Sequence, residues 1–152
     1  MLGLLTKEQC LQVLQSEVVG RIGCYSKEDG VYIVPITYAF DGKFIYAHSK
    51  EGLKIQLMRK NSRVCFQVDH IENMANWRSI IAWGEYQEIK ADDYDSAMKI
   101  IKDRLVPLMI SESVKPSHGL QYPEVVTKPA KAVAFKISIN DITGRFEKTG
   151  DS

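Results

Sequence analysis

Alternating apolar and polar positions run along most of the chain and predict a protein built mainly from strands. Residues 18–26 and 31–40 are rich in β-branched and aromatic side chains, and residues 27–30 between them have the composition of a turn. These two segments predict a hairpin. The Asp-Gly pair at 41–42 is a strong turn signal, and the alternation over 44–49 predicts a third strand.

The second half of the chain continues this pattern. Residues 63–69 and 133–139 alternate as half-buried strands do, and 77–89 is largely apolar on both faces. One face carries Trp77, Ser79, Ile81 and Trp83, and the other carries Ile80, Ala82, Gly84 and Tyr86. Both faces therefore need partners, and we expect six or seven strands in total.

Helical spacing interrupts the strands at three places. Thr6 followed by Gln9 is a capping-box pattern that predicts a helix over 6–16. Ser49 is expected to cap a second, short helix over 50–60. Helices inserted between antiparallel strands favour the α+β class with a barrel-like sheet.

A third helix is expected over 93–106, ending before Pro107. Its start is acidic at 92–95, which fits either a site for a hard cation or carboxylates that complement the helix dipole. Residues 107–130 hold four of the five prolines and predict a loop.

Composition and charge describe an ordinary globular chain with one domain over residues 1–152. Hydrophobic residues make up 45% and charged residues 26%, proportions that argue against disorder. The 20 basic and 19 acidic residues leave a net charge of +1. Such a charge offers no general attraction for nucleic acid or an anionic membrane.

Cysteine usage and the amino terminus predict a cytoplasmic protein. Cys10, Cys24 and Cys65 are odd in number and lack CxxC spacing, which fits a reducing compartment. The first residues lack the basic start and apolar run of a signal peptide. No stretch approaches the roughly 20 apolar residues of a membrane helix.

The sequence lacks the common nucleotide and metal motifs. There is no GxGxxG after a strand and no GxxxxGK[ST], so a Rossmann site and a P-loop have no support. His48, His70 and His118 are not paired with each other or with cysteines at zinc-ligand spacing. We therefore expect no metal site.

Residues 34–54, VPITYAFDGKFIYAHSKEGLK, contain much of the candidate chemistry. Pro35 removes a ladder donor from its strand, so it marks an edge or a bulge where backbone groups can meet a planar heteroaromatic ligand. The alternative is that Pro35 only protects an edge strand from aggregation.

Ser49, Gly52 and Lys54 gather at the start of the predicted short helix. Backbone N–H groups, a hydroxyl, a glycine that permits close approach and an ammonium together make a phosphate site. Lys50 and Lys54 also oppose the helix dipole unless an anion is bound. The alternative is that Lys54 lies on a solvated helix face.

Residues 76–87, NWRSIIAWGEYQ, are the second part of the candidate site. Arg78 and Ser79 could reach a phosphate or the edge of a ring, and Trp77 could cover an aromatic ligand. A core strand with two large aromatic side chains is the alternative.

The elements G-R-I-G, V-P-I-x-Y, Y-x-H-S-x-x-G-x-K and W-R-S-I-I-x-x-G occur in this order over 18–86, and I-T-G-R follows at 142–145. In these elements the chain resembles the FMN-binding split-barrel superfamily of pyridoxine 5′-phosphate oxidase-like proteins, and most of all its nitroimidazole-resistance branch. The resemblance implies a mostly antiparallel FMN-binding split β-barrel with about three helices packed around it. It also implies a homodimer with FMN at the subunit interface.

The resemblance further implies roles for individual residues. The flavin ring would be edged, largely through backbone groups, by Pro35, Ile36, Thr37 and Tyr38. The ribityl phosphate would be held by His48, Ser49 and Lys54, with Ala47 and Gly52 beside them. The flavin of the same or the partner subunit would be reached by Trp77, Arg78 and Ser79. His48 is the one candidate catalytic side chain, and its alternative role is to orient the ligand.

The expected function is that of an FMN-dependent oxidoreductase that passes electrons to a small planar acceptor, such as a nitroaromatic compound or a 5-nitroimidazole. The chain ends GRFEKTGDS, without the tryptophan-containing segment and Arg-x-His motif of the pyridoxine phosphate oxidases, so oxidation of pyridoxamine phosphate is not expected. The alternatives are a non-catalytic flavin- or haem-binding protein on the same barrel, and a module that has lost its ligand.

Overall fold

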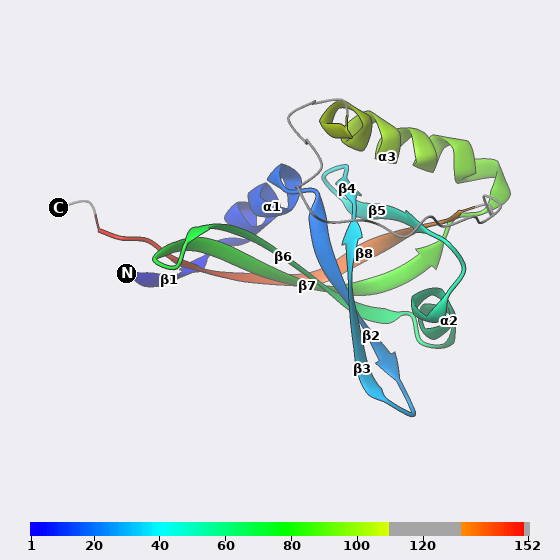
Figure 1. The fold of residues 1–152 in the computed structure, drawn as a ribbon, viewed down its shortest axis with the longest axis horizontal. Coiled ribbons are helices and arrows are strands. Elements are labelled where there is room, and N and C mark those ends of the chain that lie inside the picture. The colour runs from blue at the N-terminus through cyan, green and yellow to red at the C-terminus, as the bar shows by residue number, and fades with distance from the viewer. Residues whose placement is uncertain (110–131, 151–152) are drawn as a thin grey trace, which may run out of the picture.

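The computed structural model describes residues 1–109 and 132–150, which form one antiparallel sheet with three α-helices (Figure 1). The strands are β1 (Leu2–Leu5), β2 (Val19–Ser26), β3 (Gly30–Thr37), β4 (Ala39–Phe40), β5 (Phe44–Ser49), β6 (Arg63–Asn73), β7 (Asn76–Glu88) and β8 (Val133–Glu147). The helices are α1 (Lys7–Ser16), α2 (Leu53–Lys60) and α3 (Tyr94–Met109), and a 3-10 turn over Ala91–Asp93 precedes α3. The predicted α+β class is confirmed.

The sheet curls into a barrel that stays open between its two end strands. The strand order is β3-β2-β6-β7-β8-β5-β4, with β1 paired to β8. Strands β3 and β4 stand at opposite ends of this order, yet only Tyr38 separates them in the chain. The sheet must therefore curl until its ends meet, although β3 and β4 do not pair with each other in the described residues (Figure 1).

Tyr38 anchors the turn between these two ends. Its side chain is fully buried, its hydroxyl donates to the carbonyl of Leu14 at 2.7 Å, and its ring meets Phe66 edge-on at 5.0 Å. The prediction of one continuous strand over 31–40 is therefore wrong. Local alternation cannot show that the chain leaves one edge of the sheet at Tyr38 and joins the other.

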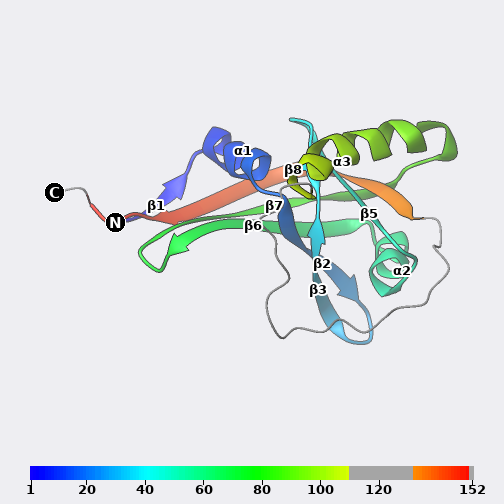
Figure 2. The same ribbon diagram turned by 45° about the horizontal axis from the view of Figure 1, so that its top comes forward.

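Helix α1 begins at the predicted capping box. The Gln9 N–H donates to the Thr6 hydroxyl at 3.2 Å, and the Thr6 N–H donates to the Gln9 side-chain oxygen at 2.9 Å. Cys10, Val13 and Leu14 are its buried side chains. Helices α1 and α3 lie along the upper side of the sheet in Figure 2, whereas α2 packs beside β2.

Helix α2 begins at Leu53, three residues later than predicted. Its N-cap is Gly52, which offers no side-chain hydrogen bond. The Ser49 hydroxyl donates instead to the carbonyl of Lys50 at 2.9 Å, so the prediction of Ser49 as the cap is wrong. Residues 50–52 form a short connection that leaves the start of α2 uncapped.

Helix α3 runs through Pro107, so the predicted end before this proline is wrong. Pro107 lies in the last turn, where a missing N–H removes one intrahelical bond and only two residues follow. The predicted loop over 107–130 is thus helical at 107–109, and the rest of it lies outside the described residues.

Several strands are longer than the sequence pattern predicts. β6 continues to Asn73 and β8 to Glu147, and β1 pairs with the end of β8 from Leu2↔Glu147 to Leu5↔Gly144. β1 has only four residues, LGLL, and no alternation of apolar and polar residue types, which explains why it was not predicted. No helix among the described residues has the length and apolar character needed to span a bilayer.

Candidate functional site

The start of α2 is an open set of backbone donors. The first hydrogen bond within the helix runs from the Gln56 N–H to the Gly52 carbonyl at 3.1 Å, so the N–H groups before it lack helical acceptors. No side chain caps this end, and its first turn contains no acidic residue. A Cβ on Gly52 would meet only the Lys50 carbonyl oxygen, at 3.9 Å, so this glycine leaves room above the helix terminus.

Lys54 adds a positive charge to the same helix turn. Its side chain is half-buried and forms no ion pair with the described residues. The ammonium lies close enough to Cys24 on β2 to affect its titration: burial raises the pKa of the Cys24 thiol to about 11, and Lys54 partly opposes that rise. A half-buried cation at a helix N-terminus is unfavourable unless an anion joins it. The α2 start therefore fits a phosphate group.

An ion-pair network that the sequence pattern did not reveal lies beside this helix. The Arg59 guanidinium donates two hydrogen bonds to the Glu51 carboxylate, at 2.7 and 3.0 Å, and one to Glu88 at 2.7 Å. The Tyr86 hydroxyl also donates to Glu88, at 2.8 Å. Glu51 and Arg59 are eight positions apart, a spacing that the i,i+4 rule for helix pairs does not detect.

His48 and Ser49 point to opposite faces of β5, because successive side chains alternate along a strand. Burial and the ammonium of Lys102 on α3 lower the pKa of His48, which places its imidazole on the α3 side. Its Nδ1 atom is buried and has no hydrogen-bond partner among the described residues. Ala47 and Ser49 face the other way, and Ala47 is fully buried in the core.

The outer edge of β3 is unpaired within the described part of the chain, as Pro35 predicts. Pro35 and Thr37 are exposed, while Ile36 is buried and the Tyr38 side chain is committed to the core. Arg21 is the cross-strand neighbour of Pro35 and forms an ion pair with Asp69 at 3.3 Å. The sequence pattern does not reveal this ion pair, because Asp69 is 48 residues from Arg21 and meets it only through the β2–β6 pairing.

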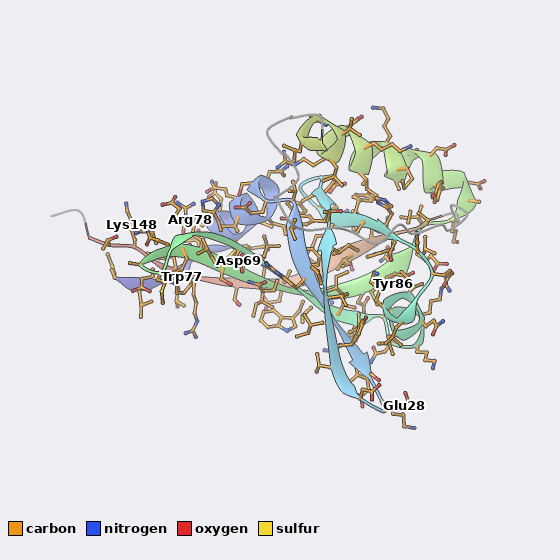
Figure 3. The ribbon with its side chains drawn as sticks, in the orientation of Figure 1. Glu28, Asp69, Trp77, Arg78, Tyr86 and Lys148 are labelled. Atoms are coloured by element: carbon orange, nitrogen blue, oxygen red, sulfur yellow. The ribbon has the colours of Figure 1, made fainter. Side chains whose placement is uncertain are left out.

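The remaining predicted residues lie far from α2. Figure 3 places Trp77 and Arg78 near the tip of the β6–β7 hairpin, at the opposite end of the molecule from Tyr86, which lies beside α2. The Trp77 indole donates to Glu147 at 3.1 Å, and Ser79 accepts from Gln67 at 3.0 Å. Exposed Arg78 lines a hollow of about 340 Å³ with Leu5, Gln9, Gln12, His70, Glu72, Asn76, Trp77, Phe146, Glu147 and Lys148. One chain therefore presents two separate groups of candidate residues.

One face of the sheet is exposed and carries many apolar side chains among its polar ones. Strand register places Ile33, Gly23, Cys65 and Trp83 in one row, and Pro35, Arg21, Gln67 and Ile81 in the next. Large exposed apolar side chains on this face are Leu2, Leu4, Val19, Tyr25, Val31, Ile33, Ile71, Ile81 and Trp83. We call this surface the open face. A hollow of about 570 Å³ lies on it between Gly23 and Trp83.

The sequence predicts that both faces of β7 need packing partners, and the open face is one of these two faces. Ile80, Ala82, Gly84 and Tyr86 of β7 are buried, but Ile81 and Trp83 on the other side are 38% and 43% exposed. An exposed apolar surface spread over several strands is typical of a protein–protein interface. The chain alone therefore covers only one of the two faces of β7.

Comparison with protein families gives one match over most of the chain. A model described as pyridoxamine 5′-phosphate oxidase matches residues 6–146. Among curated proteins, an uncharacterized protein of Rhizobium meliloti is 29% identical over 152 residues, which is 97% of this chain and 96% of that protein.

Solved structures confirm the split-barrel fold. A FAD-binding protein from Mesorhizobium loti is 27% identical, with a TM-score of 0.76 over 97% of this chain and 99% of that chain. A candidate 5-nitroimidazole antibiotic resistance protein from Bacteroides thetaiotaomicron is 17% identical, with a TM-score of 0.67 over 96% of this chain and 89% of that chain. The similarity to split-barrel proteins therefore extends from the sequence motifs to the fold of nearly the whole chain.

Proposed function

Because the chain belongs to the pyridoxamine 5′-phosphate oxidase family, we propose that it is an FMN-dependent oxidoreductase that reduces small planar acceptors such as nitroaromatics and 5-nitroimidazoles. The observation that carries the proposal is the uncapped start of α2, where Gly52 leaves space and Lys54 forms no ion pair with the residues that the structure describes. The Mesorhizobium loti structure is named as a FAD-binding protein, which supports a flavin at the corresponding site.

The residues present fit a flavin mononucleotide in two ways. The free N–H groups of α2 and the Lys54 ammonium would bind the phosphate dianion, and the unpaired edge of β3 around Pro35 would face the ring. When bound, the flavin would supply the electron transfer, while the protein would set its position and exclude water. His48, with its lowered pKa and its place beneath α3, would serve as a neutral orienting group.

The direct test is to identify the ligand that the native protein carries. We expect the purified protein to be yellow and to release FMN, identified by mass spectrometry. Reduction of a nitroaromatic compound with an external donor would then separate the oxidoreductase from a flavin-binding protein without this activity. A haem spectrum, or a colourless protein that takes up no flavin on titration, would contradict the proposal.

Replacing Lys54 by alanine should weaken FMN binding about ten- to hundred-fold, because a charge-assisted contact in a partly desolvated site contributes roughly 1.5–3 kcal/mol. Lys50→Ala is the matched control, since Lys50 is exposed and lies outside α2. Isothermal titration of both apoproteins with FMN measures the difference. Equal losses in the two variants would mean that only net charge matters.

We further propose that two copies pair through the open face, with FMN at their interface. This arrangement would bring the Trp77–Ser79 group of one subunit toward the α2 start of its partner, which a single chain cannot do. An obligate interface of this kind buries more than about 2,000 Å² in total. Sedimentation of the wild-type protein at micromolar concentration should show a dimer.

Substitution of an open-face residue should disrupt this dimer. Ile81→Asp places a charge in the proposed interface, and Val106→Asp is the control, because Val106 on α3 is similarly exposed, 42% against 38%. We expect Ile81→Asp to sediment as a monomer and Val106→Asp as a dimer. A monomeric wild-type protein, or a dimer that survives Ile81→Asp, would count against pairing through the open face.

The cysteines support a cytoplasmic location within this proposal. Cys10 and Cys24 are buried thiols, Cys65 is partly exposed, and none is in a disulfide. Burial raises the pKa of Cys10 and Cys24, which keeps both thiols protonated near neutral pH. Three free thiols in one small domain are typical of proteins in a reducing compartment.

A further inference from the structure

Glu51 lies one residue before the N-cap of an uncapped helix. A carboxylate in this position is attracted by the positive end of the helix dipole and can accept hydrogen bonds from free first-turn N–H groups. Those N–H groups are the ones that we assign to the FMN phosphate. Glu51 is thus a competitor for the phosphate position, built into the same chain.

Arg59 holds the Glu51 carboxylate away from that position. The guanidinium donates to both carboxylate oxygens from the last turn of α2, at 2.7 and 3.0 Å, so both oxygens of Glu51 are bound to Arg59. Glu88 on β7 accepts from the Arg59 Nε at 2.7 Å, and the Tyr86 hydroxyl donates to the same Glu88 oxygen. Arg59 is therefore fixed to the sheet while it holds Glu51.

The two glutamates surround the Arg59 guanidinium with negative charge. Hydrogen bonds to Glu51 and Glu88 raise the pKa of Arg59, and a guanidinium is charged throughout the physiological pH range. A planar guanidinium meets a carboxylate through two parallel hydrogen bonds, a geometry that lysine cannot reproduce. The two glutamates also pair with the charge of Arg59, whereas Lys54 forms no ion pair within the described residues and can meet a phosphate.

We propose that Arg59 is a positioning residue for phosphate binding, and that it acts by keeping Glu51 off the start of α2. The inference rests on the proposed function, because it concerns the same phosphate position. Arg59 should therefore affect the binding affinity of ligands that carry a phosphate, and of no others. The flavin ring does not touch the α2 start in this proposal, so replacing Arg59 should leave the affinity for riboflavin unchanged.

The test compares Arg59→Gln, Glu51→Gln and the double variant, each titrated as apoprotein with FMN and with riboflavin by fluorescence quenching. Arg59→Gln should lower FMN affinity about tenfold and leave riboflavin affinity within about twofold. Adding Glu51→Gln should restore FMN affinity, because the competing carboxylate is gone. Lys60→Gln is the control for net charge, since Lys60 lies in the same helix turn without binding Glu51.

A second measurement needs no flavin. In apo Arg59→Gln, the amide resonances of Leu53 and Lys54 should move from their wild-type positions, because the freed Glu51 carboxylate accepts hydrogen bonds from these N–H groups. In the double variant with Glu51→Gln, they should return toward the wild-type positions. Equal losses for both flavins, no rescue by Glu51→Gln, or unmoved amide resonances would overturn the role of Arg59. A wild type that binds neither flavin would refute the proposed function, and the comparison of amide resonances would still decide whether Arg59 restrains Glu51.

Discussion

Riboflavin should bind at least about a hundredfold more weakly than FMN, because it lacks the phosphate that satisfies the donors at the start of α2. The free N–H groups, the space at Gly52 and the half-buried Lys54 ammonium would all stay without an anion in the riboflavin complex. Only the ring contacts along β3 would remain. Titration of the apoprotein with both flavins, followed by fluorescence quenching, gives the ratio directly.

FAD provides the control for this comparison, since it carries the same phosphate with an adenylate attached. The α2 start places the half-buried Lys54 beside a single phosphate position, and the sequence has no GxGxxG turn to hold a pyrophosphate. We therefore expect FAD to bind more weakly than FMN but more tightly than riboflavin. Equal affinities for riboflavin and FMN would show that residues 49–54 do not bind a phosphate, and would remove the main structural support for the proposal.

The strands and helices that follow one periodicity were predictable from the sequence. The capping box of Thr6 and Gln9, the hairpin across the 27–30 turn and the strand at 77–89 each depend on local spacing, and the structure confirms them. The second strand of the hairpin, predicted to reach residue 40, ends at Thr37. The position of Tyr38 was not predictable, because its anchor is the Leu14 carbonyl, 24 residues earlier. The apolar–polar periodicity predicts a strand or a helix well, but it does not predict which edge of a curled sheet a strand joins.

The candidate site also contains features that local sequence predicts and features that depend on the tertiary fold. The sequence places Gly52 and Lys54 together because they are neighbours at a helix start, and the structure keeps them so. It also groups His48 with Ser49, although strand alternation sends their side chains to opposite faces of β5. The contribution of Arg59 depends on contacts with Glu51 and Glu88, made through the tertiary fold.

The separation of the two groups of predicted residues gives the proposed dimer a functional role. Trp77 and Ser79, which lie on the open face of β7, can share one ligand with Lys54 only if the partner subunit provides one of the two groups. The open face, with its exposed Ile81 and Trp83, is the surface that such pairing would cover. Loss of the dimer should therefore weaken flavin binding even when the α2 start is intact.

Gly84→Ala should destabilise the fold by about 3 kcal/mol or more, roughly a 10 °C fall in the melting temperature at fixed protein concentration. A Cβ on Gly84 would stand 1.8 Å from the Ser138 carbonyl oxygen, which belongs to the backbone of β8 and cannot rotate away. The contact lies next to the irregularity in the β7–β8 register at Trp83/Gly84, where the two strands approach closely.

Gly52→Ala is the matched control, because the same added methyl group meets only one atom, at 3.9 Å, and the backbone there is extended. Gly52→Ala should cost less than about 1 kcal/mol of stability, yet it should weaken FMN relative to riboflavin, since the methyl group would enter the space assigned to the phosphate. Thermal unfolding and flavin titration of both variants separate the two roles. A Gly84→Ala protein that melts with the wild type would mean that β7 and β8 can move apart at this point, and a Gly52→Ala protein with an unchanged FMN-to-riboflavin ratio would place the phosphate elsewhere.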